Sequence, residues 1–271
     1  MPVLEILGYL GAVAIGLSLG LIGGGGSILT VPILVYLMSV EPILATAYSL
    51  FVVGFSALVG GVRYAKKGLV NYKAGVAFAV PAFITVYSTR SLIVPVLPDI
   101  WLTINSFVIT KNMAILLLFA LLMVSASISM IRKKKGANGE EQEGYVAADL
   151  NYVMIAIVGI VVGVLSGMVG AGGGFLIIPA LVIFAHLPMK AAVGTSLLII
   201  AVNSLIGFIG DIQVGTPIDW FFLLIFTGIA SLGIFIGSYL SKFIDGSKLK
   251  QGFGWFVLVM GTFMIVKELL F

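Results

Sequence analysis

The feature of this sequence that most restricts its fold is a series of apolar stretches, each long enough to cross a lipid bilayer. A membrane-spanning helix needs about 20 apolar residues, because the hydrocarbon core is about 30 Å thick. Charged residues are only 10% of the chain, too few to cover a water-soluble domain. The sequence therefore predicts an all-α polytopic membrane protein. The full-length stretches run through 42–62, 74–97, 112–131, 190–210, 218–241 and 252–270.

Two further apolar regions, 4–38 and 151–187, are too long for a single crossing. Each is interrupted in its middle by a cluster of glycines, which predicts a helix, a break and a second, shorter helix. Because the bilayer holds no water to satisfy bare backbone groups, each break is expected inside the protein or beside a cavity. Together with the full stretches, these regions predict about 8–10 helical segments.

The two halves of the chain are related by an internal repeat. A shift of 147 positions superimposes glycines and prolines that shared hydrophobicity cannot explain. The predicted organisation is a first transmembrane repeat (1–131), a cytoplasmic linker (132–149) and a second transmembrane repeat (150–271). The matched pairs include Gly16/Gly163, Gly20/Gly167, Gly23/Gly170, Gly25/Gly172, Gly26/Gly173 and Pro32/Pro179.

Basic residues predict which side of the membrane each loop faces, because cytoplasmic loops collect lysine and arginine. The loop after 42–62 is strongly basic, whereas the equivalent loop after 190–210 contains no lysine or arginine. This difference predicts an inverted-topology repeat, in which each half contains a glycine-broken hairpin and three full helices around a midplane site. Both termini are expected outside the bacterial inner membrane. The topology also accounts for the net charge of +4, so no nucleic-acid partner is expected.

The two glycine clusters form the candidate substrate-binding site. A helix that restarts after a break presents unpaired N–H groups and the positive end of its dipole, which attract an anion. Two such ends, brought together by the repeat, would form an anion cage near the bilayer centre. The alternative is that glycines only let helices pack closely, which is the role expected for Gly16, Gly20, Gly163 and Gly167. The candidate residues are Gly23, Gly24, Gly25, Gly26 and Ser27 in the first cluster and Gly170, Ala171, Gly172, Gly173 and Gly174 in the second.

Neutral polar side chains in two apolar helices extend the candidate site. Ser49 aligns with Ser196 across the repeat, Ser56 aligns with Asn203, and Thr195 adjoins Ser196. Neutral donors suit an oxyanion that must bind and also leave. The alternative for each side chain is a hydrogen bond to the preceding helical turn or to a neighbouring helix.

Arg90 is a lone cation within apolar sequence. A charge in the membrane is costly unless it pairs, snorkels to the headgroups or faces water. Arg90 is therefore interpreted either as a snorkelling residue or as an anion-attracting group at the mouth of the pathway. The acidic residues are all expected at helix ends or in loops. Export down the substrate's own gradient is then the simplest scheme, although Glu41 or Asp211 could titrate.

The paired glycine clusters, the proline six to nine residues beyond each, and the Ala-Val-Gly-Thr-Ser-Leu segment at 192–197 carry a family resemblance. They resemble the sulfite exporter TauE/SafE family, also called the TSUP or DUF81 permeases. The resemblance implies transport of a small sulfur-containing or organic anion, such as sulfite, thiosulfate or a sulfonate. The first half departs from the pattern, because Thr-Ala-Tyr-Ser at 46–49 stands opposite Val-Gly-Thr-Ser at 193–196.

The leading functional hypothesis is an exporter of a small anion that works by alternating access. An anion channel would use the same breaks, and turnover and counterflow would separate the two. An intramembrane enzyme is disfavoured, since the chain has one histidine and no cysteine for metal or acid–base chemistry. A scaffold is disfavoured because broken helices are costly without a ligand. No cofactor or metal is expected, and the expected partners are the anion and the bilayer, with a homo-oligomer left open.

Overall fold

Long helices make up most of the chain, described here in a computed structural model that covers residues 2–104, 107–131, 151–240 and 246–270. Seven of the described helices have the length and apolar composition of a membrane span, which confirms the predicted polytopic α-helical class. The elements are α1 (Pro2–Ile22), the 3-10 helix η1 (Gly24–Leu29), α2 (Thr30–Tyr36), α3 (Pro42–Lys66), α4 (Tyr72–Ser88), the π-helix η2 (Thr89–Ile93), α5 (Val94–Val96), β1 (Ile100–Ile104), β2 (Phe107–Thr110), α6 (Lys111–Ile131), α7 (Tyr152–Val169), α8 (Gly174–Phe184), α9 (Met189–Gln213), α10 (Trp220–Leu240) and α11 (Gly246–Leu270).

Two elements differ from the sequence-based expectation. The outward loop near Trp101 contains an antiparallel hairpin, in which β1 pairs with β2, where only a loop was expected. Isoleucine, threonine and valine are frequent in this segment and favour extended backbone. The second difference is the π-helix η2, which continues α4 through Arg90. The predicted linker 132–149 lies outside the described residues.

Large apolar side chains cover much of the outer surface. Val76, Leu121, Phe221 and Leu232 are each more than half exposed. A water-soluble protein rarely exposes such a continuous apolar surface, whereas lipid chains solvate it well. The outward faces of these helices are therefore the lipid-facing faces.

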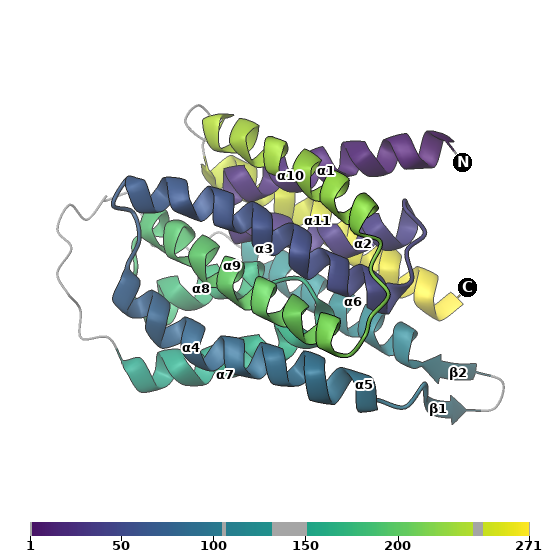
Figure 1. Ribbon diagram of the computed structural model, residues 1–271. Helices are drawn as coiled ribbons and strands as arrows, with labels where there is room; N and C mark the ends of the chain where they lie inside the picture. Colours follow the sequence, from purple (N-terminus) through teal and green to yellow (C-terminus); the bar gives the residue numbers. More distant parts are fainter. Residues whose placement is uncertain (1, 105–106, 132–150, 241–245, 271) are drawn as a thin grey trace.

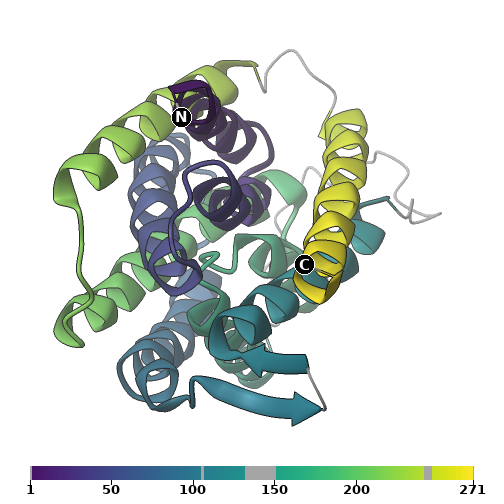
Figure 2. The same ribbon diagram turned by 90° about the vertical axis from the view of Figure 1, so that its right-hand side faces the viewer.

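Helices from the two halves pack against each other in a repeated pattern. α1 packs along α10, and α7, the repeat counterpart of α1, packs along α4, the counterpart of α10. α3 packs along its own counterpart α9, and α6 along α11 (Figures 1 and 2). α3 starts at the end of the molecule that holds both termini, whereas α9 starts at the opposite end (Figure 1). This pairing is what a twofold axis between the halves would produce, and the inverted duplication itself stays a prediction.

Glycines permit the closest of these helix contacts. A Cβ atom on Gly16 of α1 would lie 2.8 Å from Gly233 Cα of α10, and one on Gly163 of α7 would lie 2.6 Å from the Ala82 carbonyl oxygen of α4. Gly20 meets the backbone of α10 in the same way, and Gly167 meets the Thr89 side chain of η2 and the Val86 carbonyl oxygen of α4. The predicted packing role of these glycines is confirmed, since any side chain there would force the helices apart.

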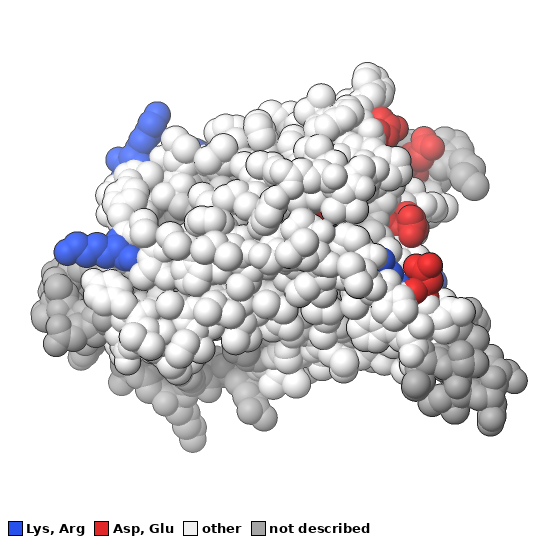
Figure 3. Space-filling view, turned by 60° about the horizontal axis from the view of Figure 1, so that its bottom comes forward, with Lys and Arg blue, Asp and Glu red and all other residues white. Residues whose placement is uncertain are grey.

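Basic side chains gather at one end of the molecule, and acidic side chains gather at the other end with a few basic ones beside them (Figure 3). The basic end is formed where α3 ends and where α4 and α9 begin, and the acidic end is formed where α3 and α10 begin and α11 ends. Membrane proteins keep basic loops on the cytoplasmic side, so this polarity is the one expected for an inserted protein. The described residues at the basic end are Arg63, Lys66, Lys67, Lys73 and Lys190, and those at the acidic end include Glu41, Asp99, Asp219 and Glu268.

Candidate functional site

The first glycine cluster forms a tight turn followed directly by helix. Gly23 has φ 75° and ψ −131°, a conformation that favours glycine, and it separates α1 from η1. Gly24, Gly25, Gly26 and Ser27 then lie within η1. A Cβ atom on Gly26 would lie 2.4 Å from the Leu19 nitrogen of α1, so this glycine allows η1 to fold back on α1. The first break is therefore a single-residue turn.

The second glycine cluster forms a longer break. Gly170 caps α7 in the left-handed conformation, and Gly172 and Gly173 also have positive φ angles of 66° and 69°. Ala171 is 1% exposed, and α8 restarts at Gly174, which is also buried. The first N–H groups of a helix have no partner within the helix, so the start of α8 directs donors into a buried turn.

Each break contacts the long helix of the opposite half at equivalent positions. A Cβ atom on Gly23 would lie 2.8 Å from Val193 Cγ1 of α9. A Cβ atom on Gly170 would lie 2.4 Å from Thr46 Cβ of α3. Gly170 and Val193 are the repeat counterparts of Gly23 and Thr46, so the two breaks are held by corresponding contacts.

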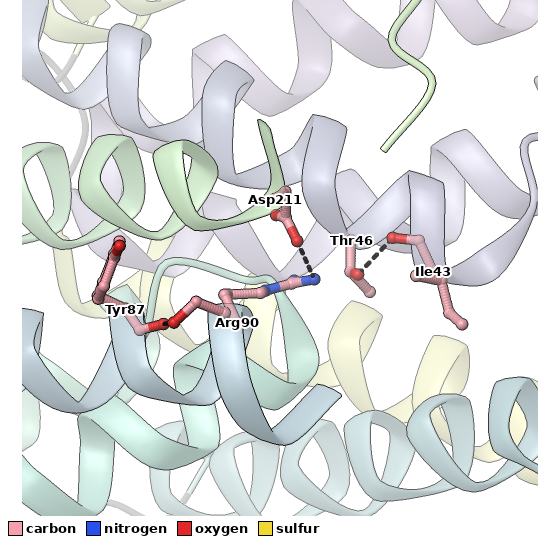
Figure 4. A network of polar contacts seen from close by, with 6 residues as sticks. Ile43, Thr46, Tyr87, Arg90 and Asp211 are labelled. Atoms are coloured by element: carbon pink, nitrogen blue, oxygen red, sulfur yellow. Dashed lines mark hydrogen bonds and ion pairs between the residues drawn. The ribbon is translucent and has the colours of Figure 1, made fainter. Parts of the chain in front are cut away.

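Arg90 reaches the second break. A Cβ atom on Gly170 would lie 2.6 Å from Arg90 Nη2, so the guanidinium and Thr46 converge on the same glycine. Figure 4 shows the side chain extended from η2 toward Asp211 and Thr46. Gly210 of α9 makes this approach feasible, because a Cβ atom there would already lie 3.0 Å from Arg90 Cβ. Gly170 and Gly210 thus both leave space for the Arg90 side chain.

Arg90 and Asp211 form a buried ion pair. Arg90 Nη1 lies 3.3 Å from Asp211 Oδ1, and the two residues are 1% and 5% exposed. The snorkelling interpretation of Arg90 is therefore wrong, because the protein itself encloses the guanidinium. Asp211 lies in the last turn of α9, as expected for an acidic residue, but it is buried rather than exposed. We name Thr46, Arg90, Gly170 and Asp211 the Arg90 site.

The ion pair leaves much of its hydrogen-bonding capacity unused. Nε and Nη2 of Arg90 and Oδ2 of Asp211 have no hydrogen-bond partner among the described residues. Buried polar atoms are nearly always hydrogen-bonded, because an unpaired group loses its interaction with water. With three such atoms, the ion pair can accept further hydrogen-bonding partners and is a candidate binding site.

Unpartnered neutral polar groups continue from the Arg90 site along α9 and α3. A Cβ atom on Gly172 would lie 2.6 Å from Ser204 Oγ, which is buried and has no described partner. Asn203 Oδ1 and Ser49 Oγ are also buried and unpartnered. Gly172, Asn203 and Ser49 were candidate site residues, and their groups remain available to a ligand.

Two other candidate residues have structural hydrogen bonds. Thr195 Oγ1 accepts a hydrogen bond from Asn71 N at 2.9 Å, where the loop after α3 enters α4 at the basic end. Ser196 Oγ donates to the Val193 carbonyl oxygen of its own helix at 2.8 Å. Thr195 thus lies away from the Arg90 site, and Ser196 has the local bond that was its alternative interpretation.

Thr46, Ser204 and Asp211 are the residues that sequence reasoning left out of the candidate site. Asn203 and Ser204 each lie seven or eight residues from Ser196 and from Asp211 along α9, so helical periodicity alone could have placed these residues near one face. Thr46 lies three residues before Ser49 on α3, but its contact with Gly170 of the other half could not be read from the sequence.

Comparison with known proteins identifies the family. The profile of the sulfite exporter TauE/SafE family matches residues 8–264. A probable membrane transporter protein of Xylella fastidiosa is 31% identical over 255 residues, covering 93% of this chain and 91% of that protein. The probable membrane transporter protein YunE of Bacillus subtilis is 30% identical over 248 residues, covering 88% of each chain. No solved structure matches the chain. The chain belongs to the sulfite exporter TauE/SafE family and is a membrane transporter.

Proposed function

We propose that the protein carries a small sulfur-containing or organic anion, such as sulfite, thiosulfate or a sulfonate, across the bacterial inner membrane. The observation that supports this best is the convergence of a buried, half-paired arginine on the glycine break that precedes α8. The guanidinium would supply the positive charge, and the N–H groups at the start of α8 would supply further donors. An oxyanion satisfies both kinds of group at once.

The neutral groups beside the break support an oxyanion of small size. Ser204 Oγ lies next to the position of Gly172, two residues after Gly170, and Asn203 precedes Ser204 on α9. A neutral hydroxyl donor such as Ser204 Oγ binds an oxyanion less tightly than a second cation would, so the substrate can leave again. We assign the substrate site to the Arg90 site together with Gly172, Asn203 and Ser204.

Alternating access is the mechanism that fits this enclosure. Arg90, Asn203 and Ser204 are each 1% exposed or less, so neither end of the molecule gives a solute direct access to them. A carrier opens such a site to one side at a time, whereas a channel needs a continuous path. The two breaks, each packed against the long helix of the opposite half, are the contacts that would separate when the halves rock apart.

The orientation we propose has the basic end in the cytoplasm and both termini outside. The Arg90 site then lies nearer the outer side, because Asp211 is in the last turn of α9 at the acidic end. Export is the direction that the family description suggests. Since the relatives bear the names of transporters, we propose transport without an enzymatic step.

Counterflow in proteoliposomes tests this proposal. Vesicles loaded with unlabelled thiosulfate are diluted into a trace of labelled thiosulfate, and protein-free vesicles are the control. A carrier should accumulate the label transiently above its equilibrium level. Competition by unlabelled sulfite, sulfonates and carboxylates then ranks the substrates. Simple equilibration without an overshoot would indicate a channel, and failure of every anion in the panel to exchange would reject anion transport.

A further inference from the structure

We propose that Asp211 takes up a proton when Arg90 binds the transported anion, so that the protein moves the anion together with a proton. This inference rests on the proposed function, because it assigns a coupling ion to the same site. It starts from an ion pair that is enclosed by protein, lies within two membrane spans and is only partly satisfied.

The geometry of the pair leaves room for an anion without displacing Asp211. Asp211 contacts Nη1 of Arg90, whereas the edge formed by Nε and Nη2 has no described partner. That edge has two parallel N–H groups, which is the arrangement that binds an oxyanion bidentately. Asp211 therefore holds the guanidinium in place while its free edge faces the second break.

The charges at this site require compensation when an anion binds. Arg90 and Asp211 together are neutral, so a bound monovalent anion leaves one uncompensated negative charge inside the protein. An uncompensated charge in a low-dielectric interior is strongly unfavourable. Arginine stays protonated, so the carboxylate is the group that can change its charge. A proton transferred from a hydronium ion to the unpartnered Oδ2 of Asp211 restores neutrality, with one O–H bond formed at the carboxyl group and one broken in the hydronium ion.

The other described titratable groups on the helices packed against α9 are less suited to this role. η1 and α8 contain none. On α3, the Tyr48 hydroxyl at this end accepts a hydrogen bond from Asp219 N, and Arg63, Tyr64 and Lys66 lie at the opposite end. On α4, the Tyr87 hydroxyl donates to Gln213 Oε1, and Tyr72 and Lys73 lie in the first turn at the basic end. Asp211 is thus the carboxylate in contact with Arg90.

The test uses methanesulfonate and thiosulfate, because neither anion titrates near neutral pH. Counterflow is first measured without a pH gradient, which tests the proposed function alone. A pH gradient with an alkaline lumen is then imposed at zero membrane potential. The wild-type protein should accumulate methanesulfonate in the lumen above its outside concentration. Pyranine inside the vesicles should report the entry of protons and methanesulfonate in equal number.

Two isosteric variants separate Asp211 from other acidic residues. Asp211→Asn should exchange more slowly than the wild type, and a pH gradient should no longer drive accumulation. Asp219→Asn is the matched control at the same end of the molecule, since its side-chain oxygen can still accept from Phe222 N. It should respond to the pH gradient as the wild type does. If Asp211→Asn does not fold, Asp211→Glu, which keeps a titratable group, should retain gradient-driven accumulation with a shifted pH profile.

The outcomes distinguish the two proposals. Counterflow in the wild type without any response to the pH gradient, or gradient-driven accumulation that persists in Asp211→Asn, would overturn proton coupling and leave anion transport standing. Where Asp211→Glu stands in for Asp211→Asn, an unshifted pH profile would overturn coupling through Asp211. Absence of counterflow for both anions would overturn both proposals.

Discussion

At the residue scale, the geometry of the site depends on two glycines with positive φ angles and on one ion pair. Gly170 and Gly172 adopt φ angles that side chains disfavour, and each brings backbone next to a polar side chain, Arg90 Nη2 and Ser204 Oγ respectively. Asp211 fixes one nitrogen of Arg90 and leaves the opposite edge open. The substrate's affinity should therefore depend on the shape of the guanidinium as well as its charge.

Substitution of Arg90 tests this dependence. Arg90→Gln should reduce counterflow at least about tenfold, since the anion loses its bidentate partner, worth more than about 1.4 kcal/mol. It should also lower stability by about 3–5 kcal/mol, because Asp211 is left buried and unpaired. Arg90→Lys keeps the charge without the planar fork, so its counterflow should be intermediate. Thermal unfolding followed by size-exclusion chromatography gives the stability.

The control for these variants is Lys73→Gln on α4, which removes an exposed cation of the same helix. Its transport and thermal stability should match those of the wild type. Equal counterflow in Arg90→Gln and Lys73→Gln would show that Arg90 does not bind the substrate.

At the element scale, the helices and the positions of both breaks could be predicted, but the geometry of the breaks could not. The lengths of the apolar stretches predicted the bounds of α3, α6 and α10 to within a few residues, because a helix must be apolar along the whole thickness of the hydrocarbon core. The clusters at 23–26 and 170–174 were recognised as interruptions, but only contact with other helices decides that the first becomes a turn at Gly23 followed by a 3-10 helix. The hairpin of β1 and β2 lies between two spans, where hydropathy gives no signal.

The second break gives a prediction at this scale. Gly172→Ala should abolish transport and destabilise the protein, because the new methyl group would meet Ser204 Oγ at 2.6 Å and Val53 Cγ1 at 2.9 Å. Gly68→Ala is the matched control, since Gly68 has φ 68° but no neighbour within 4 Å. The control should cost about 1–2 kcal/mol for its backbone conformation alone and should transport normally. Normal counterflow in a correctly inserted Gly172→Ala protein would argue against a site at the second break.

At the scale of the whole molecule, the two halves are similar in their pairing but not in their chemistry. α1 on α10 and α7 on α4 correspond, and so do the contacts of the two breaks with α9 and α3. The Arg90 site has no equivalent, because the repeat counterparts of Arg90 and Asp211 are Gly237 and Tyr64. The repeat in the sequence led to the prediction of a duplicated architecture, whereas the ion pair, which joins two residues 121 positions apart, could be found only in the structure.

This asymmetry has a consequence for transport. In the proposed mechanism, the two corresponding breaks would let the protein open on either side, and the single charged site would bind the same substrate in both states. One enclosed site beside Gly172, Arg90 and Ser204 should then become accessible from each side of the membrane in turn.

The reaction of a cysteine at position 204 with a thiol reagent from each side of the membrane is the most direct test of this alternating access. The chain contains no cysteine, so Ser204→Cys introduces a single thiol, and Ser204 is fully buried in the closed arrangement. A membrane-impermeant thiol reagent added outside the vesicles should modify this cysteine both in right-side-out vesicles and in inside-out vesicles. Thiosulfate or methanesulfonate should slow the reaction in both kinds of vesicle. Modification from one side only, or modification that neither anion slows, would contradict an alternating-access anion site at this position.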